Sequence, residues 1–137
     1  MRTALDTNIL SLFWSREPWA ALIADQLSKA RAEGGLVVSA PVFVELSAIP
    51  TGDAQRVERL LGEMAIAVDF DLAEDVWRLA ATSFAAYAVR RRRSGGGSPK
   101  RLPADFVIAS HAVLQADRLM TRDASRYSLD FPNLRLW

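Results

Sequence analysis

The sequence contains no cysteine and only one histidine, His111, among its 137 residues. Without cysteine, the chain has no disulfide framework, no thiolate metal site and no cysteine nucleophile. A single histidine is poor support for a zinc site, and it excludes a mechanism that depends on a pair of histidines. A metal ion bound by this protein would therefore be held by oxygen ligands.

Long hydrophobic runs are also absent. Stretches without a charged residue, such as residues 34–44, fall well short of the about 20 apolar residues that span a bilayer. The N-terminus has no apolar run followed by a cleavage-like site, so we expect no signal peptide, no membrane contact and a cytoplasmic location. With 50% hydrophobic and 24% charged residues, the composition predicts one globular domain over residues 1–137.

The net charge of +1 hides an uneven distribution of charge. Between Asp75 and Asp105 the sequence has no acidic residue. The basic residues of this stretch are Arg78, Arg90, Arg91, Arg92, Arg93, Lys100 and Arg101. The rest of the chain is acidic in sum, and such a separation indicates one basic surface and one acidic site.

Short apolar segments alternate with segments of helical periodicity along the chain. We predict strands at residues 2–5, 36–39, 65–70 and 118–121, with a possible fifth at 134–137. Helices are predicted after the first strand and at residues 17–35, 40–49, 51–64, 71–93 and 104–116, with Asp53 as an N-cap. Apolar strands that alternate with helices indicate an α/β fold, a parallel sheet flanked by helices.

Two acidic residues, Asp6 and Asp123, directly follow the first and fourth predicted strands. The carboxyl edge of such a sheet is where ligands bind, so both side chains are expected there. The alternative for each is a structural role, because aspartate is a favoured N-cap residue.

Two further acids lie on apolar helix faces. Glu45 shares its face with Val42, Leu46 and Ile49, and Asp105 shares its face with apolar residues of the helix that it begins. An isolated buried carboxylate is costly and is normally paired, protonated or bound to metal. Each of these two acids also has a structural alternative. For Asp105 it is stabilisation by the helix dipole at the N-terminus of its helix, and for Glu45 it is a partly exposed place at the edge of the apolar face.

Taken together, the four acids predict a single pocket. Carboxylates that converge raise one another's pKa unless a cation is present, and an all-oxygen donor set suits Mg²⁺ or Mn²⁺. A hard cation among carboxylates, with a basic surface elsewhere, indicates hydrolysis of phosphodiester bonds.

Four segments of the sequence resemble motifs of the PIN-domain nucleases, and in particular of the VapC-type toxins of toxin–antitoxin pairs. In chain order they are LDTNIL, VFVEL, PADFVIASHA and RLMTRDASRY. The resemblance implies that Asp6, Glu45, Asp105 and Asp123 form the metal-binding catalytic quartet, with Asn8 and Thr121 supporting it through hydrogen bonds. It further implies five parallel strands in the order 3-2-1-4-5, a homodimer, and Mg²⁺-dependent endoribonuclease activity silenced by a cognate VapB-like antitoxin. One departure is that Ser125 and Arg126 stand where some members carry a further acid.

Other features of the sequence fit an interaction with RNA or a partner. The basic residues from Arg90 to Arg93, with Lys100 and Arg101, flank a glycine-rich loop that leads into Asp105, and we expect them to contact RNA phosphates. Phe13, Trp14 and Trp19 either pack in the core or form a groove for an antitoxin segment. His111 is expected to point away from the acids, as a surface or packing residue rather than a catalytic one.

Two other classes of function fit the sequence less well. Phosphoaspartate chemistry fits poorly, because a phosphatase of that kind needs a second aspartate where this chain has Asn8, and a receiver domain needs its aspartate after the middle strand. The remaining alternative is a catalytically silent PIN-like protein that binds RNA or a partner. The presence of all four acids favours the nuclease.

Overall fold

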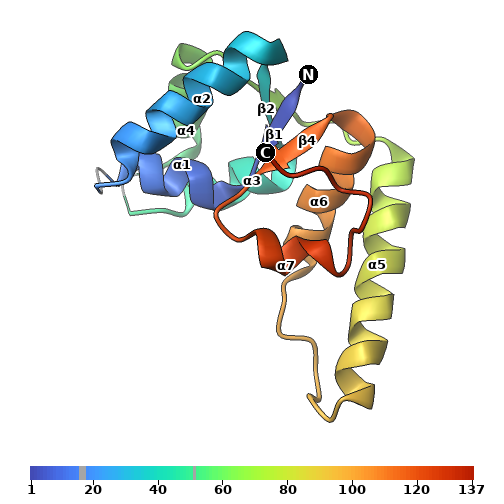
Figure 1. The fold of residues 1–137 in the computed structure, drawn as a ribbon. Coiled ribbons are helices and arrows are strands. Elements are labelled where there is room, and N and C mark those ends of the chain that lie inside the picture. Colours follow the sequence, from blue (N-terminus) through green and yellow to red (C-terminus); the bar gives the residue numbers. More distant parts are fainter. Residues whose placement is uncertain (16–17, 51) are drawn as a thin grey trace.

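The computed structural model describes residues 1–15, 18–50 and 52–137. In chain order, its elements are β1 (Thr3–Leu5), α1 (Thr7–Trp14), α2 (Ala20–Gly34), β2 (Leu36–Ser39), α3 (Ala40–Ser47), α4 (Ala54–Glu63), β3 (Ile66–Asp69), α5 (Glu74–Arg93), α6 (Pro103–Gln115), β4 (Arg118–Met120) and α7 (Ala124–Ser128). In Figure 1, α1 and α2 lie on one side of the sheet and α5 and α6 on the other. The predicted parallel α/β architecture is therefore confirmed.

The sheet has four strands in the order β3-β2-β1-β4 in the part of the chain that is described, and all its pairs are parallel. The fifth predicted strand is reduced to a single parallel bridge between Leu136 and Leu119 of β4. Its position beside β4 is the expected one. A turn in which the Leu134 amide donates to the Phe131 carbonyl leaves too short a segment to pair as a strand.

The helices begin and end close to the predicted positions. Asp53 caps α4, since its side chain accepts a hydrogen bond of 2.9 Å from the Arg56 amide, which confirms the predicted N-cap. Three helices begin later than predicted, α2 at Ala20, α4 at Ala54 and α5 at Glu74. The first residues predicted for α2 and α4, Glu17 and Thr51, lie outside the described part of the chain.

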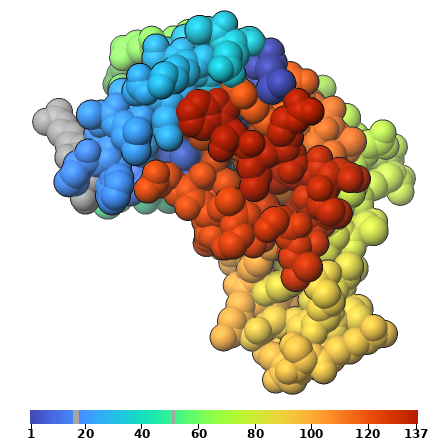
Figure 2. Space-filling model, in the orientation of Figure 1, coloured from blue at the N-terminus to red at the C-terminus, as the bar shows by residue number. Residues whose placement is uncertain are grey.

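The core lies between the sheet and the helices. Every residue of β1 and β2 is buried, and α6 is buried continuously from Phe106 to Ala112. The C-terminal part of α5 and the basic loop after it (residues 94–102) extend from this body as an arm, which Figures 1 and 2 show in yellow and light orange. Among the described residues, no helix combines the length and the apolar character needed to cross a membrane.

His111 lies inside this core, with 1% of its surface exposed. Its Nε2 is 2.7 Å from Asp69 Oδ2, and Arg2 donates to both oxygens of the same carboxylate. Burial alone would raise the pKa of Asp69, but the hydrogen bonds from His111 and Arg2 lower it. Burial lowers the pKa of His111. The histidine contacts none of the four acids singled out above, as expected of a packing residue.

Candidate active site

Asp6 connects the end of β1 to the start of α1, and the residue is 3% exposed. Its Oδ1 accepts a hydrogen bond of 2.7 Å from the Thr7 amide, so the residue caps α1. Its Oδ2 accepts from the hydroxyls of Thr121 and Tyr127, both at 2.8 Å. A buried carboxylate held on both oxygens has a fixed direction, and the capping role therefore coexists with a fixed place in the site.

Glu45 lies on the helix face that carries the buried residues Val42 and Leu46, as the sequence pattern predicted. The Thr7 hydroxyl donates a hydrogen bond of 2.7 Å to Glu45 Oε1. Burial raises the pKa of Glu45, the hydrogen bond from Thr7 opposes this, and the charges of Asp105 and Asp6 raise the pKa further. Thr7 thus links two of the predicted quartet, since its amide contacts Asp6 and its hydroxyl contacts Glu45.

Asp105 occupies the first turn of α6. Burial raises its pKa, the charges of Arg126 and Arg101 oppose the rise, and the charge of Asp6 adds to it. Asp123 precedes α7, and its Oδ2 lies 3.2 Å from Arg126 Nε while its Oδ1 accepts a hydrogen bond of 3.1 Å from the Ser125 hydroxyl.

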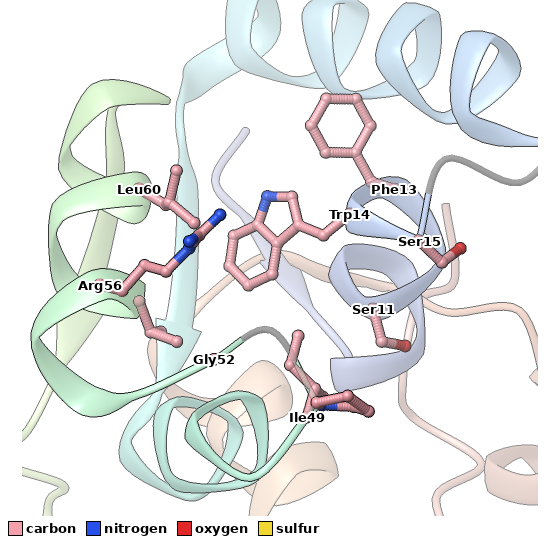
Figure 3. Close-up of a pocket in the computed structure, with 10 residues that line it drawn as sticks. Ser11, Phe13, Trp14, Ser15, Ile49, Gly52, Arg56 and Leu60 are labelled. Atoms are coloured by element: carbon pink, nitrogen blue, oxygen red, sulfur yellow. The ribbon is translucent and has the colours of Figure 1, made fainter.

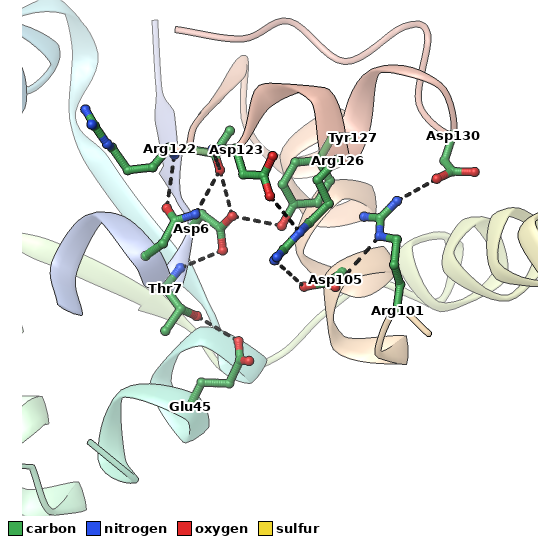
Figure 4. A network of polar contacts seen from close by, with 12 residues as sticks. Asp6, Thr7, Glu45, Arg101, Asp105, Arg122, Asp123, Arg126, Tyr127 and Asp130 are labelled. Carbon is green, nitrogen blue, oxygen red and sulfur yellow. Dashed lines mark hydrogen bonds and ion pairs between the residues drawn. The ribbon is translucent and has the colours of Figure 1, made fainter. Parts of the chain in front are cut away.

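The four acids face one region at the carboxyl edge of the sheet (Figure 4). The negative charge of Asp6 acts on both Glu45 and Asp105, and that of Asp105 acts on Glu45, so these carboxylates lie within electrostatic reach of one another. Their donor atoms are all carboxylate oxygens, which fit Mg²⁺ or Mn²⁺ in chemistry. In their present positions, no three acidic or histidine side chains of the described residues are arranged to hold a metal ion together.

A hydrogen-bonded network surrounds Asp6. Asn8 Nδ2 donates to the Thr121 hydroxyl at 3.3 Å, and Asn8 Oδ1 accepts from the Arg122 amide at 3.1 Å. The Thr121 hydroxyl in turn accepts from the Asp123 amide at 3.1 Å. Asn8 and Thr121 therefore tie the loop after β4 to the start of α1.

Sequence reasoning missed Thr7 and Tyr127. Tyr127 is fully buried, and burial together with the charge of Asp6 raises its pKa, so the phenol stays protonated and donates to Asp6. The one available signal was its position one helical turn after Asp123, which places an aromatic residue beside the acids.

The basic residues around the loop have different surroundings. Arg90 and Arg101 both donate to the carboxylate of Asp130, and Arg101 lies over the ring of Phe106 at 4.7 Å from its centre. Arg91 donates to the carbonyls of Gly96 and Ser98 within the loop. The side chains with no such contact in the described structure are those of Arg92, Arg93 and Lys100.

Apart from the acids, the structure has an apolar pocket of about 780 Å³ between α1 and α4. Its apolar lining consists of Phe13, Trp14, Ile49, Pro50, Val57 and Leu60, with Arg56 at one side. Trp14 points into it toward Arg56 and Leu60 (Figure 3). The prediction that Trp19 shares a groove with Phe13 and Trp14 is wrong for this pocket, because Trp19 does not line it. Trp19 is half-exposed and lies under the guanidinium of Arg122 at 5.1 Å.

The PIN domain family model matches residues 3–132. The chain belongs to the PIN domain family. Its fold is similar to solved structures of VapBC2 from Rickettsia felis bound to a promoter DNA fragment (TM-score 0.66, 18% identity, covering 100% of this chain and 98% of that one) and of VapBC-1 from nontypeable Haemophilus influenzae (0.63, 20%, covering 100% and 97%). FitAcB from Neisseria gonorrhoeae is a further neighbour (0.59, 20%, covering 98% and 96%). A search of curated proteins found no match.

Proposed function

We propose that this PIN domain protein is a metal-dependent endoribonuclease and the toxin of a VapBC-type toxin–antitoxin pair. The observation that carries the proposal is the convergence of Asp6, Glu45, Asp105 and Asp123 at the carboxyl edge of the sheet. Membership of the PIN domain family supports it, and so does the similarity of the fold to solved toxin–antitoxin structures.

In this proposal, Asp6, Asp105 and Asp123 would hold the cation and Glu45 would orient the attacking water. When bound, Mg²⁺ or Mn²⁺ supplies positive charge that polarises the scissile phosphate and makes water more acidic. Thr7 fixes one oxygen of Glu45, while Thr121 and Tyr127 fix the direction of Asp6. Because these carboxylates influence one another's ionisation, the proton taken from water belongs to the cluster and is not assigned to one residue.

The basic arm brings positive charge to the same end of the molecule. Arg92, Arg93 and Lys100 are exposed and are proposed to contact the phosphate backbone of RNA. Contacts of this kind provide affinity that decreases with salt, and they do not select a sequence.

The test is the cleavage of total cellular RNA by the purified protein. We expect discrete products with Mg²⁺ or Mn²⁺ and none with EDTA, since a carboxylate cluster cannot by itself polarise a phosphate. Cleavage that continues in EDTA would contradict the metal-dependent mechanism. RNA binding without cleavage under either ion would instead favour a catalytically silent PIN-like binding protein.

We propose that the apolar pocket between α1 and α4 receives a segment of the cognate VapB-like antitoxin. An exposed concave apolar surface with an aromatic residue at its centre has the character of a protein-binding site.

The homodimer implied by the resemblance stays a prediction, which sedimentation of the purified toxin would test.

Replacing Trp14 with alanine should weaken binding of the cognate VapB-like antitoxin by about 30-fold, the usual size of a central aromatic contact. Titration calorimetry with the purified antitoxin measures this affinity. Trp77→Ala is the matched control, because Trp77 is an exposed tryptophan of α5 outside the pocket. Equal affinity of the Trp14 variant and the control, with both variants folded, would exclude the pocket as the antitoxin site.

A further inference from the structure

Arg126 places a cation among the candidate metal ligands. Its Nε lies 3.2 Å from Asp123 Oδ2, and its Nη1 lies 3.6 Å from Asp105 Oδ1 (Figure 4). Its side chain is 40% exposed, so the guanidinium reaches the carboxylates from the solvent side. The single positive charge of Arg126 is thus shared between two of the four acids and offsets half of their combined charge.

A second site for the same side chain adjoins the first. Arg126 also lines a pocket of about 450 Å³ with Arg90, Arg91, Arg101, Ser94, Ser125 and Asp130. Four arginines and one acid make this pocket strongly positive. Arginine binds phosphate through two parallel hydrogen bonds, so the pocket suits a phosphate of an RNA strand.

The backbone of α7 is anchored independently of Arg126. Tyr127 is buried and bonded to Asp6, and the Phe131 amide donates to the Tyr127 carbonyl at 2.9 Å. The Arg126 side chain is long and partly exposed, and it has ion pairs as its only described polar contacts. It can therefore change partners by rotamer changes alone, while the acids keep their places.

We propose that Arg126 is an exchangeable cation that occupies the metal position until a divalent ion displaces it into the adjoining arginine pocket, where it binds an RNA phosphate. This inference rests on the proposed function, because it concerns the same carboxylates and the same substrate. A divalent ion and a guanidinium cannot share Asp105 and Asp123 without strong repulsion, so binding of one excludes the other. RNA, by holding Arg126 in the pocket, favours metal binding, and the metal favours RNA binding to the same extent.

Arg126→Gln separates the two functions of the side chain. We expect its affinity for Mn²⁺, measured by titration calorimetry without RNA, to rise roughly three- to tenfold, because a competing charge pair of partly exposed groups is removed. The KM for RNA cleavage with saturating Mn²⁺ should rise by a similar factor, because one phosphate contact is lost. A structural defect would weaken both, so opposite shifts are the signature of an exchanged cation.

Arg78→Gln is the matched control. It removes the same charge from an exposed position on α5, where Arg78 pairs only with Glu74 among the described residues. It should leave the Mn²⁺ affinity unchanged. Arg126→Lys keeps the charge and should give a Mn²⁺ affinity close to that of the wild type.

The calorimetric result overturns the inference if Arg126→Gln binds Mn²⁺ no more tightly than the control. That outcome leaves the proposed nuclease intact as long as wild-type protein binds Mn²⁺ and cleaves RNA. If neither the wild type nor the variant binds Mn²⁺, both the inference and the metal-dependent function are wrong. A rise in Mn²⁺ affinity with no change in KM would confirm the competition and exclude the phosphate contact.

Discussion

Asp6→Asn is expected to slow RNA cleavage strongly. Removing an outer hydrogen-bonding partner of a metal site costs ~10–100-fold, and the loss of a proposed metal ligand should exceed that. The substitution replaces a carboxylate with a neutral amide at the residue that α1, Thr121 and Tyr127 all hold in place. Asparagine caps helices as well as aspartate does, so α1 should remain formed. The measurement is the rate of RNA cleavage with Mn²⁺, beside a thermal denaturation curve.

The matched control for this variant is Asp53→Asn. Asp53 caps α4 with the same kind of hydrogen bond, from its carboxylate to a backbone amide, and it contacts none of the four acids. It should cleave RNA at the wild-type rate. A folded Asp6→Asn protein that matches this control in activity would show that Asp6 serves only as a cap.

Phe106→Ala is expected to lower the free energy of unfolding by about 3–5 kcal/mol. The Phe106 ring is fully buried and contacts the rings of Phe84 at 5.1 Å, Tyr87 at 5.5 Å and Phe131 at 5.8 Å, measured between centres. It therefore joins α5, α6 and the C-terminal segment. Its removal leaves a cavity and takes away the surface on which the Arg101 guanidinium lies.

Urea denaturation of the variant, with its midpoint and slope, measures this loss. Phe106→Leu, which keeps most of the buried volume, should cost much less. Because Phe106 follows Asp105 directly in α6, the alanine variant should also cleave RNA more slowly under conditions where it remains folded. A loss below about 1 kcal/mol would mean that the neighbouring rings collapse into the cavity, and the three elements would then be held together by other contacts.

The local features of the fold were predictable because they depend on short stretches of sequence. The apolar segments at 36–39 and 118–121 became β2 and β4, and Pro103 marks the start of α6 as proline commonly does at a helix N-terminus. The half-buried position of Glu45 follows from the same periodicity, since residues at i−3 and i+1 on its helix are buried.

The contacts that complete the site were not predictable, because they join residues far apart in the sequence. Tyr127 and Asp6 are separated by 121 residues, and Thr7 and Glu45 by 38. Side-chain hydrogen bonds of this range depend on how whole elements pack. The same holds for Arg126. In the sequence it is notable only because some family members carry an acid at this place, whereas the structure places its guanidinium between Asp105 and Asp123.

Asp130 forms two ion pairs that restrain the basic loop. The loop therefore loses less conformational entropy when it binds a ligand. Arg90 lies in the last turn of α5 before this loop and Arg101 lies near the loop's end, and both pair with one carboxylate that is 4% exposed. Ordering a free residue costs about 1–2 kcal/mol. Because the ends of this loop are already held, the cost of ordering it on binding falls mainly on the residues at its tip. The tip is restrained in part by Arg91, which donates to the carbonyls of Gly96 and Ser98, and its backbone has φ angles of 77° at Gly95 and 72° at Gly97, which favour glycine. Through Asp130, the C-terminal segment thus pre-organises the basic loop, although the two are far apart in the sequence.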